Sequence, residues 1–291
     1  MGKLIRCITS CGQVMATAVD TTDIVTEAER IHTTSAVVTA ALGRLLTAGS
    51  MMGNMLKGKD NSITLKIAGG GPTGSLIVVA DFNGDVRGYV QNPVVELPLN
   101  EKGKLDVGGA VGKDGFLYVL KDLGLKEPFS GTVPLVSGEI AEDITSYYAL
   151  SEQIPTVCAL GVLVNPDLTV KAAGGYIIQL LPAAEDSTID KLEESISKLK
   201  PVTTMLASGM TPEEIIRAAL DGFDVEVLYT QDIEYKCNCS RDRVSQALIS
   251  LGREELTKMA EELPEVEVNC HFCDKVYKFD KKEILKFLEK N

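Results

Sequence analysis

Four cysteines in two close pairs are the residues of this chain whose types and spacing best support chemistry. Cys237 and Cys239 form a C-x-C pair, and Cys270 and Cys273 form a C-x-x-C pair further along the chain. Zinc prefers four tetrahedral ligands, and thiolates from two such pairs can supply all of them. We therefore predict that these four cysteines bind one Zn²⁺ per chain.

The C-x-C pair leaves two interpretations of this zinc site open. Most four-cysteine zinc sites are closed and structural, which would make the protein a regulatory or nucleic-acid-binding zinc ribbon with a permanent metal ion. A disulfide between residues two apart, however, closes a small strained ring that is easily reduced again. The same spacing therefore also predicts a thiol switch, with metal in one state and disulfides in the other.

The composition is that of a folded globular protein that does not bind nucleic acid. The chain has 291 residues, enough for two or three domains, with 45% hydrophobic and 24% charged residues. Its net charge of -12 disfavours a phosphate backbone as partner, because nucleic-acid binding draws its affinity from clustered Lys and Arg. An aromatic content of 5% and the absence of Trp leave few side chains for stacking on bases.

The cysteine count and the apolar stretches indicate a cytoplasmic protein. Seven cysteines, an odd number, do not resemble a secreted disulfide framework, and metal-binding thiols favour a reducing compartment. The first residues contain neither a sustained apolar run nor a myristoylation motif. The longest apolar stretch, 34–56, is interrupted by Arg44 and several glycines. It is predicted to be a buried helix, so no membrane span is expected.

The elements that must position the cysteines fall into three predicted parts of an α+β fold. Residues 1–182 are predicted to form an antiparallel-sheet domain with helices, including a type I′ hairpin at Asn83-Gly84 and another hairpin around Asn165-Pro166-Asp167. Residues 183–230 have a helical period and are predicted to form a connector. Residues 231–291 contain two predicted helices between the cysteine pairs, a hairpin with Cys270 and Cys273 at its turn, and an Asp280-capped helix. They are predicted to form a small zinc domain.

One face of the connector is apolar. A helix beginning near residue 186 would align four residues along this stripe: Ile189, Leu192, Ile196 and Leu199. Thr211 and Pro212 then predict the start of a second helix, because Thr can cap it and Pro fits its first turn. An apolar stripe must pack against something, so the connector is not predicted to be a wholly solvated linker.

Motifs for catalysis are weak. Residues 69–74 satisfy G-x-G-x-x-G, but Pro72 interrupts the motif and a strand is predicted to follow it. A phosphate site needs a helix N-terminus there, so we interpret the segment as a loop. The chain has two histidines, His32 and His271, and neither lies in a hydrolase motif. We therefore predict that the protein is not an enzyme.

The remaining cysteines and His271 are not expected to bind the metal. Cys7, Cys11 and Cys158 have no partner pair nearby and are predicted to be buried as small hydrophobic residues. His271 lies within the C-x-x-C pair, where it could compete as a ligand. Four thiolates already complete a tetrahedron, so a histidine ligand is not predicted.

The residues around the cysteines resemble the heat-shock protein 33 family. The resemblance is carried by residues 235–244 (YKCNCSRDRV), 267–273 (EVNCHFC) and 277–279 (YKF). It extends over nearly the whole chain through residues 136–143 (VSGEIAED) and 151–153 (SEQ), among others. The combined cysteine pairs in this setting favour the thiol switch over the permanent zinc ribbon.

The resemblance implies a redox-regulated, ATP-independent holdase chaperone. In that family the reduced form holds zinc and is inactive, whereas oxidation forms disulfides, releases the metal and unfolds a metastable connector. Exposed apolar surface then captures unfolding client proteins, and the active form is implied to be a homodimer. On this basis the stripe from Ile189 to Leu199 is a candidate client-binding surface.

Oxidation is predicted to join neighbouring thiols, Cys237 to Cys239 and Cys270 to Cys273. These thiols are adjacent when zinc leaves, and closing a short loop needs little chain search. Links between the two pairs would indicate instead that the geometry around the metal decides the pairing.

Overall fold

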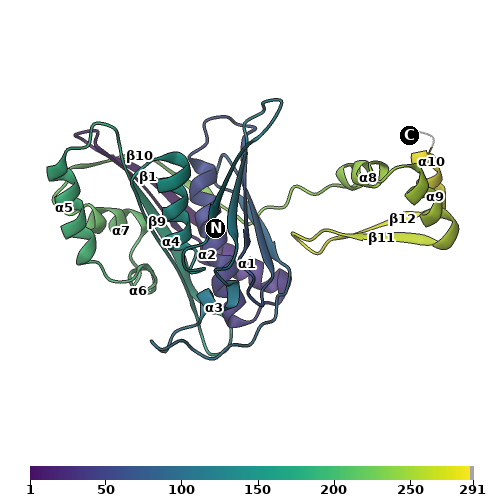
Figure 1. Cartoon of the computed structure of the whole chain (residues 1–291), viewed down its shortest axis with the longest axis horizontal. Helices are drawn as coiled ribbons and strands as arrows, with labels where there is room; N and C mark the ends of the chain where they lie inside the picture. Colours follow the sequence, from purple (N-terminus) through teal and green to yellow (C-terminus); the bar gives the residue numbers. More distant parts are fainter. Residues whose placement is uncertain (289–291) are drawn as a thin grey trace. The chain divides into compact units, whose positions relative to one another are not determined.

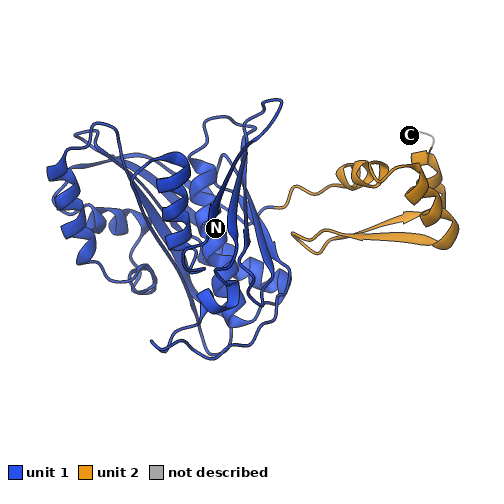
Figure 2. Cartoon of the chain, viewed as in Figure 1, with its two compact units in different colours: residues 1–236 blue, residues 237–291 orange. Residues whose placement is uncertain are grey.

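The computed structural model describes residues 1–288, which divide into two compact units (Figures 1 and 2). The first unit comprises residues 1–236, and the second begins at Cys237. The first unit contains two five-stranded antiparallel sheets with helices, and the second carries the four cysteines. The predicted α+β fold class is confirmed.

The first sheet has the strand order β10-β1-β2-β9-β8, and every neighbouring pair is antiparallel. Its strands are β1 (Gly2–Thr9), β2 (Val14–Asp20), β8 (Thr156–Val164), β9 (Val170–Leu180) and β10 (Val225–Ile233). The predicted hairpin around residues 165–167 is the β8–β9 pair. Strand β10 was not predicted. It lies where the helical connector was expected to end, and it pairs with β1 more than 200 residues earlier.

The second sheet has the order β5-β4-β3-β6-β7. Its strands are β3 (Ser62–Ala68), β4 (Ser75–Asp81), β5 (Val86–Val90), β6 (Phe116–Asp122) and β7 (Phe129–Pro134). The hairpin at Asn83-Gly84 is present, but its turn is not type I′, which needs a positive φ at both central residues. Gly84 alone of the two has a positive φ, of 80°. Its N–H donates to the Asp81 carbonyl (2.9 Å), while the Asp81 N–H donates to the Asp85 carbonyl (2.9 Å), so the connection is a longer loop.

Helix α2 (Ala36–Asn54) packs against strands of both sheets and is buried along nearly its whole length. It is long and apolar enough to cross a membrane, but 89% of its most apolar window is buried inside the unit, as in the core helix of a globular fold. Its glycines permit this packing, since a Cβ on Gly49 would come within 2.6 Å of Val78 Cγ1. The helices that complete this part of the fold are α1 (Thr22–His32), α3 (Val107–Val111) and α4 (Ala141–Tyr147), which continues into a π-helical turn.

The other face of the first sheet is covered by three connector helices, of which α5 and α7 are seen beside the sheet in Figure 1. They are α5 (Asp186–Ser197), α6 (Val202–Ala207) and α7 (Pro212–Ala219). The predicted start of α7 is confirmed, because the Thr211 hydroxyl accepts the Glu214 N–H and Pro212 is the first helical residue. Since residues 183–230 pack on the sheet and β10 belongs to it, the first unit extends to Lys236. The predicted division into three parts stays a prediction.

The second unit follows its local sequence signals closely. It contains α8 (Arg241–Ile249), α9 (Arg253–Glu262), β11 (Glu265–Asn269), β12 (Val276–Asp280) and α10 (Lys281–Leu288). The Ser240 hydroxyl caps α8 by accepting the Arg243 N–H. Asp280 Oδ1 caps α10 by accepting the Glu283 N–H (2.8 Å). The small core is formed by Leu248, Leu256, Ala260, Val266, Tyr277, Phe279 and Ile284.

Candidate metal centre

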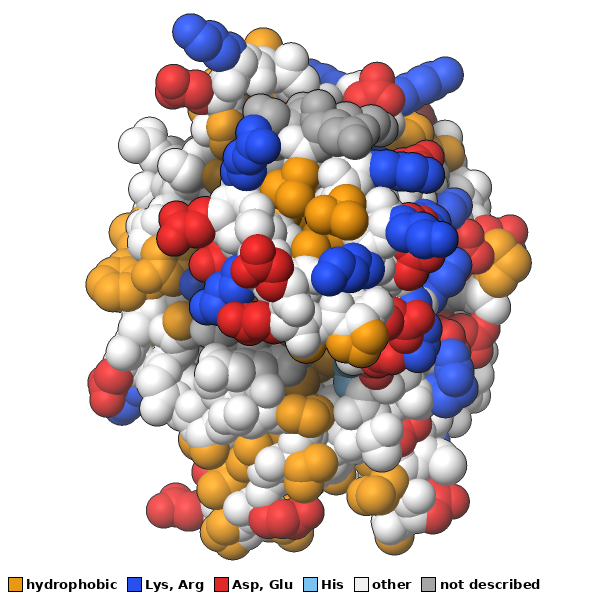
Figure 3. All heavy atoms as spheres, turned by 90° about the vertical axis from the view of Figure 1, so that its right-hand side faces the viewer, with side chains coloured by type: hydrophobic (Ala, Val, Ile, Leu, Met, Phe, Trp, Pro, Cys, Tyr) orange, Lys and Arg blue, Asp and Glu red, His pale blue; other side chains and the backbone are white. Residues whose placement is uncertain are grey.

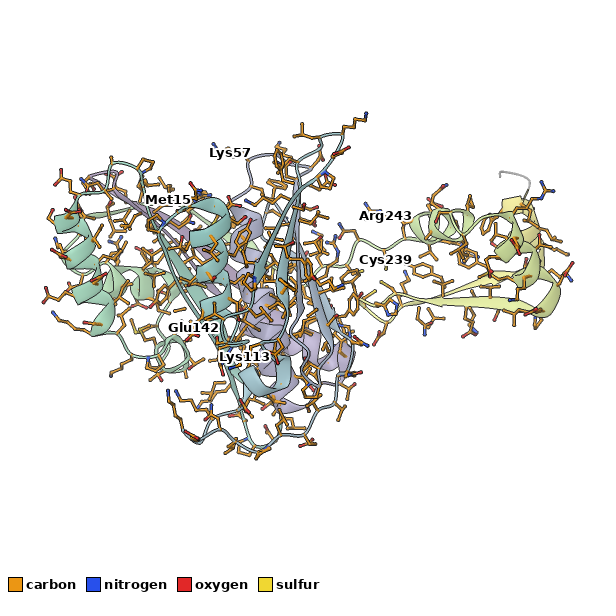
Figure 4. The ribbon with its side chains drawn as sticks, in the orientation of Figure 1. Met15, Lys57, Lys113, Glu142, Cys239 and Arg243 are labelled. Carbon is orange, nitrogen blue, oxygen red and sulfur yellow. The ribbon has the colours of Figure 1, made fainter. Side chains whose placement is uncertain are left out.

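Two loops of the second unit bring the four predicted thiols together. Cys237 and Cys239, the latter labelled in Figure 4, lie in the extended segment before α8. Cys270 and Cys273 lie at the turn between β11 and β12. All four Sγ atoms lie within 4.8 Å of one another, and each side chain is half-buried.

The dimensions of this cluster match a tetrahedral metal site. The Sγ atoms of Cys237 and Cys270 are 3.6 Å apart, and those of Cys239 and Cys273 are 3.5 Å apart. A regular tetrahedron of sulfurs at the Zn–S distance of about 2.3 Å has edges of about 3.8 Å. An all-thiolate tetrahedral site suits zinc or iron–sulfur chemistry. The four cysteines can therefore bind a metal ion such as zinc.

The turn between β11 and β12 positions one pair of thiols. The Cys270 N–H donates to the Lys275 carbonyl (3.0 Å), and the Cys273 and Asp274 N–H groups both donate to the Cys270 carbonyl (3.3 and 2.8 Å). Asp274 closes the turn with a φ of 54°, a left-handed conformation that Asp tolerates better than most residues. This tight turn holds Cys270 and Cys273 close to each other.

The thiols of the cluster differ in their ease of ionisation. Burial raises the pKa of Cys239, but hydrogen bonds from the Tyr277 hydroxyl and the neighbouring thiols outweigh it and lower the pKa to about 7. The Tyr277 hydroxyl donates to Cys239 Sγ at 3.1 Å. Burial raises the pKa of Cys237 well above its ordinary range and that of Cys273 to about 11. Because metal ligands must be thiolates, metal binding must displace protons from this cluster.

Arg241 joins the segment that carries the first cysteine pair to the hairpin that carries the second. Its guanidinium lies 4.3 Å from the centre of the Phe279 ring and donates to the Lys278 carbonyl (2.8 Å) and to Glu283 (2.7 Å). Arg241 and Tyr277 were not predicted to have such roles. No spacing rule connects either residue to its partner, because the contacting residues are 37 or more positions apart in the chain.

The candidate client-binding stripe is covered in this structure. Leu192 is 5% exposed and belongs to a cluster that includes Ile5, Ala16 and Tyr176 of the first sheet. Ile196 and Leu199 are half-buried against the same cluster, and Ile189 is also half-buried. We call the apolar residues buried between the connector helices and this face of the sheet the outer-sheet cluster: Ile5, Cys7, Val14, Ala16, Ala18, Ala172, Tyr176, Ile178, Leu192, Val202, Met205, Leu206, Ile215, Ile216, Ala219, Leu220 and Val225. The stripe would become fully exposed only if α5 left the sheet.

The cysteines outside the metal centre have different environments. Cys7 is buried, as predicted, and burial raises its pKa to about 11. Cys158 is half-buried. The prediction of burial is wrong for Cys11, which is exposed because it lies in the turn closed by the Gly12 N–H and the Thr9 carbonyl (2.7 Å). The Cys11 thiol donates to Thr9 Oγ1 (3.2 Å).

The glycine-rich segment 69–74 serves backbone packing. Its N–H groups face carbonyls of α3, with Gly71 donating to Val111 (3.0 Å) and Thr73 donating to Ala110 (3.1 Å). A Cβ on Gly69 would come within 2.3 Å of the Gly112 carbonyl oxygen. Donors occupied in this way cannot surround a phosphate, which agrees with the interpretation of this segment as a loop.

Charged side chains of both signs are present on one face of the chain. Acidic and basic side chains are interspersed on the face of the molecule shown in Figure 3, with apolar groups between them.

The chain is similar over nearly its whole length to proteins of one known family. The profile of the family described as "Hsp33 protein" matches residues 2–280. The "33 kDa chaperonin" of Geobacillus sp. strain WCH70 is 50% identical over 281 residues, which cover 97% of this chain and 95% of that protein. The protein of the same name from Bacillus cereus strain AH187 is 49% identical over 286 residues, 98% of each chain. The crystal structure of the 33 kDa chaperonin from Thermotoga maritima matches with a TM-score of 0.89 and 37% identity, over 99% of this chain and 98% of that one.

Proposed function

This chain belongs to the Hsp33 family of chaperonins, which are not enzymes, and on that premise we propose that it is a redox-regulated, ATP-independent holdase of the cytoplasm. In the reduced state it holds one Zn²⁺ through Cys237, Cys239, Cys270 and Cys273 and is inactive. Oxidation of these thiols releases the metal and unfolds part of the chain. The apolar surface exposed in this way binds unfolding proteins and prevents their aggregation, with a homodimer as the active form.

The observation that carries this proposal is the four-thiol cluster beside a small hydrophobic core. The core of the second unit is made by few residues, and Cys239 and Val244 pack against it. A unit of this size is marginally stable without a staple, and structural zinc contributes about 10 to 16 kcal/mol of apparent binding free energy in small peptides. Thiolates are also the groups that oxidants attack. Loss of zinc therefore removes most of the stability of the second unit.

The connector helices supply the surface that unfolding exposes. Helices α5, α6 and α7 have 12, 6 and 8 residues, and helices this short are marginal in water unless they pack on something. Their apolar residues are buried in the outer-sheet cluster. Undocking would therefore unfold the helices and expose both the stripe and the sheet residues beneath it.

Strand β10 limits the part of the chain that unfolds. It pairs with β1 from Val225 to Ile233, and the Tyr235 hydroxyl then donates to the Gly88 carbonyl (2.8 Å). These contacts belong to the sheets, which have extensive cores. We therefore expect two segments to lose structure on oxidation, residues 186–224 and the second unit, while β10 between them stays paired.

Disulfides between neighbours remain the proposed pairing. In the folded cluster, Sγ contacts of 3.6 and 3.5 Å join thiols of different pairs, Cys237 with Cys270 and Cys239 with Cys273. As oxidation releases the metal and the second unit loses its structure, links between the pairs would have to keep loops of more than thirty residues closed against chain entropy. Neighbouring thiols stay close in any chain conformation, so the C-x-C and C-x-x-C pairs should close first.

The test is to follow chaperone activity and zinc release in one sample. Reduced, zinc-loaded protein is mixed with a heat-unfolding client enzyme, and light scattering is recorded before and after treatment with peroxide. We expect suppression of aggregation only after oxidation, together with release of about one zinc per chain into a chromogenic chelator. A matched variant in which Cys7, Cys11 and Cys158 are replaced by Ser should show the same activation and zinc release as the wild type.

Two results would contradict the proposal. Equal suppression by the reduced, zinc-bound protein would show that the client surface is already exposed. If peroxide oxidises the exposed Cys11 but the zinc stays bound, the metal is a permanent structural one, as in the zinc-ribbon alternative. That alternative has weaker support, because the net charge of -12 does not suit a nucleic-acid partner.

A further inference from the structure

A cavity of about 940 Å³ lies along the free edge of strand β8 in the first unit. Residues 159–164 of this strand line it one after another. Side chains of a strand alternate between its two faces, so a surface lined by consecutive residues follows the edge of the strand. The facing walls are mostly apolar and include Ala36 and Ala40 of α2 and residues 201–204 at the start of α6. The charged side chains of Arg44 and Lys104 also line the cavity.

The backbone groups on this edge have no strand partner among the described residues. Strand β8 ends its sheet and pairs with β9 alone. The Leu180 N–H donates to the Pro155 carbonyl (3.0 Å). Hydrogen-bonded pairs recur at every second residue of an antiparallel ladder, so the N–H and C=O groups of the odd-numbered residues of β8 point toward β9. The N–H and C=O groups of Cys158, Leu160 and Val162 therefore point away from the sheet.

The other sheet edges of the first unit carry the devices that usually prevent added strands. The edge at β5 is covered by residues 234–236, where the Lys236 N–H donates to the Val86 carbonyl (2.9 Å). Strand β10 carries acidic side chains such as Glu226, and β7 is short and ends in Pro134. Strand β8 contains no charged residue and no proline from Thr156 to Val164.

We propose that the β8 edge accepts an extended apolar segment of an unfolding protein as an additional β-strand. The identity of the partner rests on the proposed holdase function, whereas the surface itself is present in the fold with α5 to α7 docked. Six residues of edge span about 20 Å, the length of a typical strand. Main-chain hydrogen bonds to Leu160 and Val162 would supply affinity for any sequence, and the apolar walls would favour apolar side chains.

Helix α6 connects this edge to the redox switch. Residues 201–204 belong to the connector and form one wall of the cavity. A Cβ on Gly161 would come within 2.5 Å of Thr203 Cγ2, so α6 lies directly against β8. Undocking of the connector would remove this wall and widen access to the edge. Peptide affinity should accordingly be higher in the oxidised protein than in the reduced protein.

The direct test uses reduced, zinc-loaded full-length protein and a dye-labelled peptide of eight alternating Val and Thr residues, with Lys at each end. Binding is followed by fluorescence anisotropy. Two control peptides carry N-methyl groups on all Val or on all Thr residues, which removes the N–H donors on one side of the strand only. We expect one N-methyl set to weaken binding about tenfold or more and the other set to leave it within about threefold, because two or three hydrogen bonds are lost in one case only.

Two protein variants locate the binding site. Ala36→Phe places a large side chain in the cavity from the first turn of α2 and should abolish binding. Ala68→Phe is the matched control, because Ala68 is also half-buried but lies on the second sheet. If Ala36→Phe does not fold, hydrogen exchange on the wild type replaces it, and the peptide should slow exchange of the Leu160 and Val162 amides.

Four outcomes would overturn the proposal: no saturable binding up to about 1 mM peptide, equal effects of the two N-methyl sets, binding unaffected by Ala36→Phe, or no added protection of the β8 amides. If the protein forms a dimer that Ala36→Phe dissociates but that the peptide leaves intact, the edge binds a second copy of the chain instead. These outcomes can be distinguished from a failure of the proposed redox activation. If oxidation leaves activity and peptide affinity unchanged while the reduced protein still binds the peptide at β8, the edge site stands and the switch does not.

Discussion

Leu192 should hold the connector on the first sheet. Its side chain is 5% exposed and packs in the outer-sheet cluster, near the middle of α5. Leu192→Ala removes buried methyl groups and leaves a cavity, which costs about 2 to 5 kcal/mol. Because α5 is short and stable only while docked, the lost free energy should mainly shift the equilibrium between docked and undocked α5 toward the undocked state. A cost of about 3 kcal/mol raises the undocked fraction by about 150-fold.

Hydrogen exchange of the reduced, zinc-loaded protein measures this effect. Residues 186–219 should exchange faster in Leu192→Ala, while α2 and β10 keep their protection and the zinc content is unchanged. The variant should also suppress some client aggregation without oxidant. Leu125→Ala is the control, since Leu125 is 60% exposed in the loop between β6 and β7 and should have little effect.

Two results would refute this reasoning. Unchanged exchange in α5 would mean that Leu192 does not hold the helix on the sheet. An equal loss of protection in α5 and α2 would mean that the connector and the rest of the first unit unfold together, so that undocking is not a separate step.

Three further predictions concern the cysteines. Metal analysis of protein purified under reducing conditions should find one zinc per chain, and Cys237→Ser combined with Cys270→Ser should remove it; zinc retained by that double variant would disprove the ligand assignment. Peptide mapping after peroxide should find Cys237 joined to Cys239 and Cys270 joined to Cys273, whereas dominant links between the pairs would show that the folded cluster decides the pairing. Burial raises the pKa of Cys7 from 9.0 to about 11, so between these pH values the thiol ionises in the unfolded chain before it ionises in the folded chain. The free energy of unfolding therefore keeps the contribution of Cys7 below pH 9 and loses it as the pH rises from 9 toward 11. Thermal melts should show a smaller drop over this range for Cys7→Ala than for the wild type, and an identical drop would assign the effect to other groups.

The local sequence determined most of the second unit and many elements of the first. Ser240 and Asp280 cap the helices expected to follow them, and the cysteine pairs occupy the loops expected from their spacing. The Thr211 cap and the paired strands around residues 165–167 also agree with expectation. These features depend on side chains within a few positions of one another, so their signals are present in any short window of sequence.

Tertiary structure alone decided the features that join distant segments. The run Val225–Ile233 contains Val, Tyr, Thr and Ile, which favour a strand, but it follows a segment of helical period, and only the fold shows that it pairs with β1. The stripe through Leu192 could be recognised as apolar, but only the fold shows that it covers the first sheet. The hydrogen bond from Tyr277 to Cys239 and the free edge of β8 likewise depend on which segments meet in space. Pairing between distant residues depends on long-range packing energy, which local spacing does not encode.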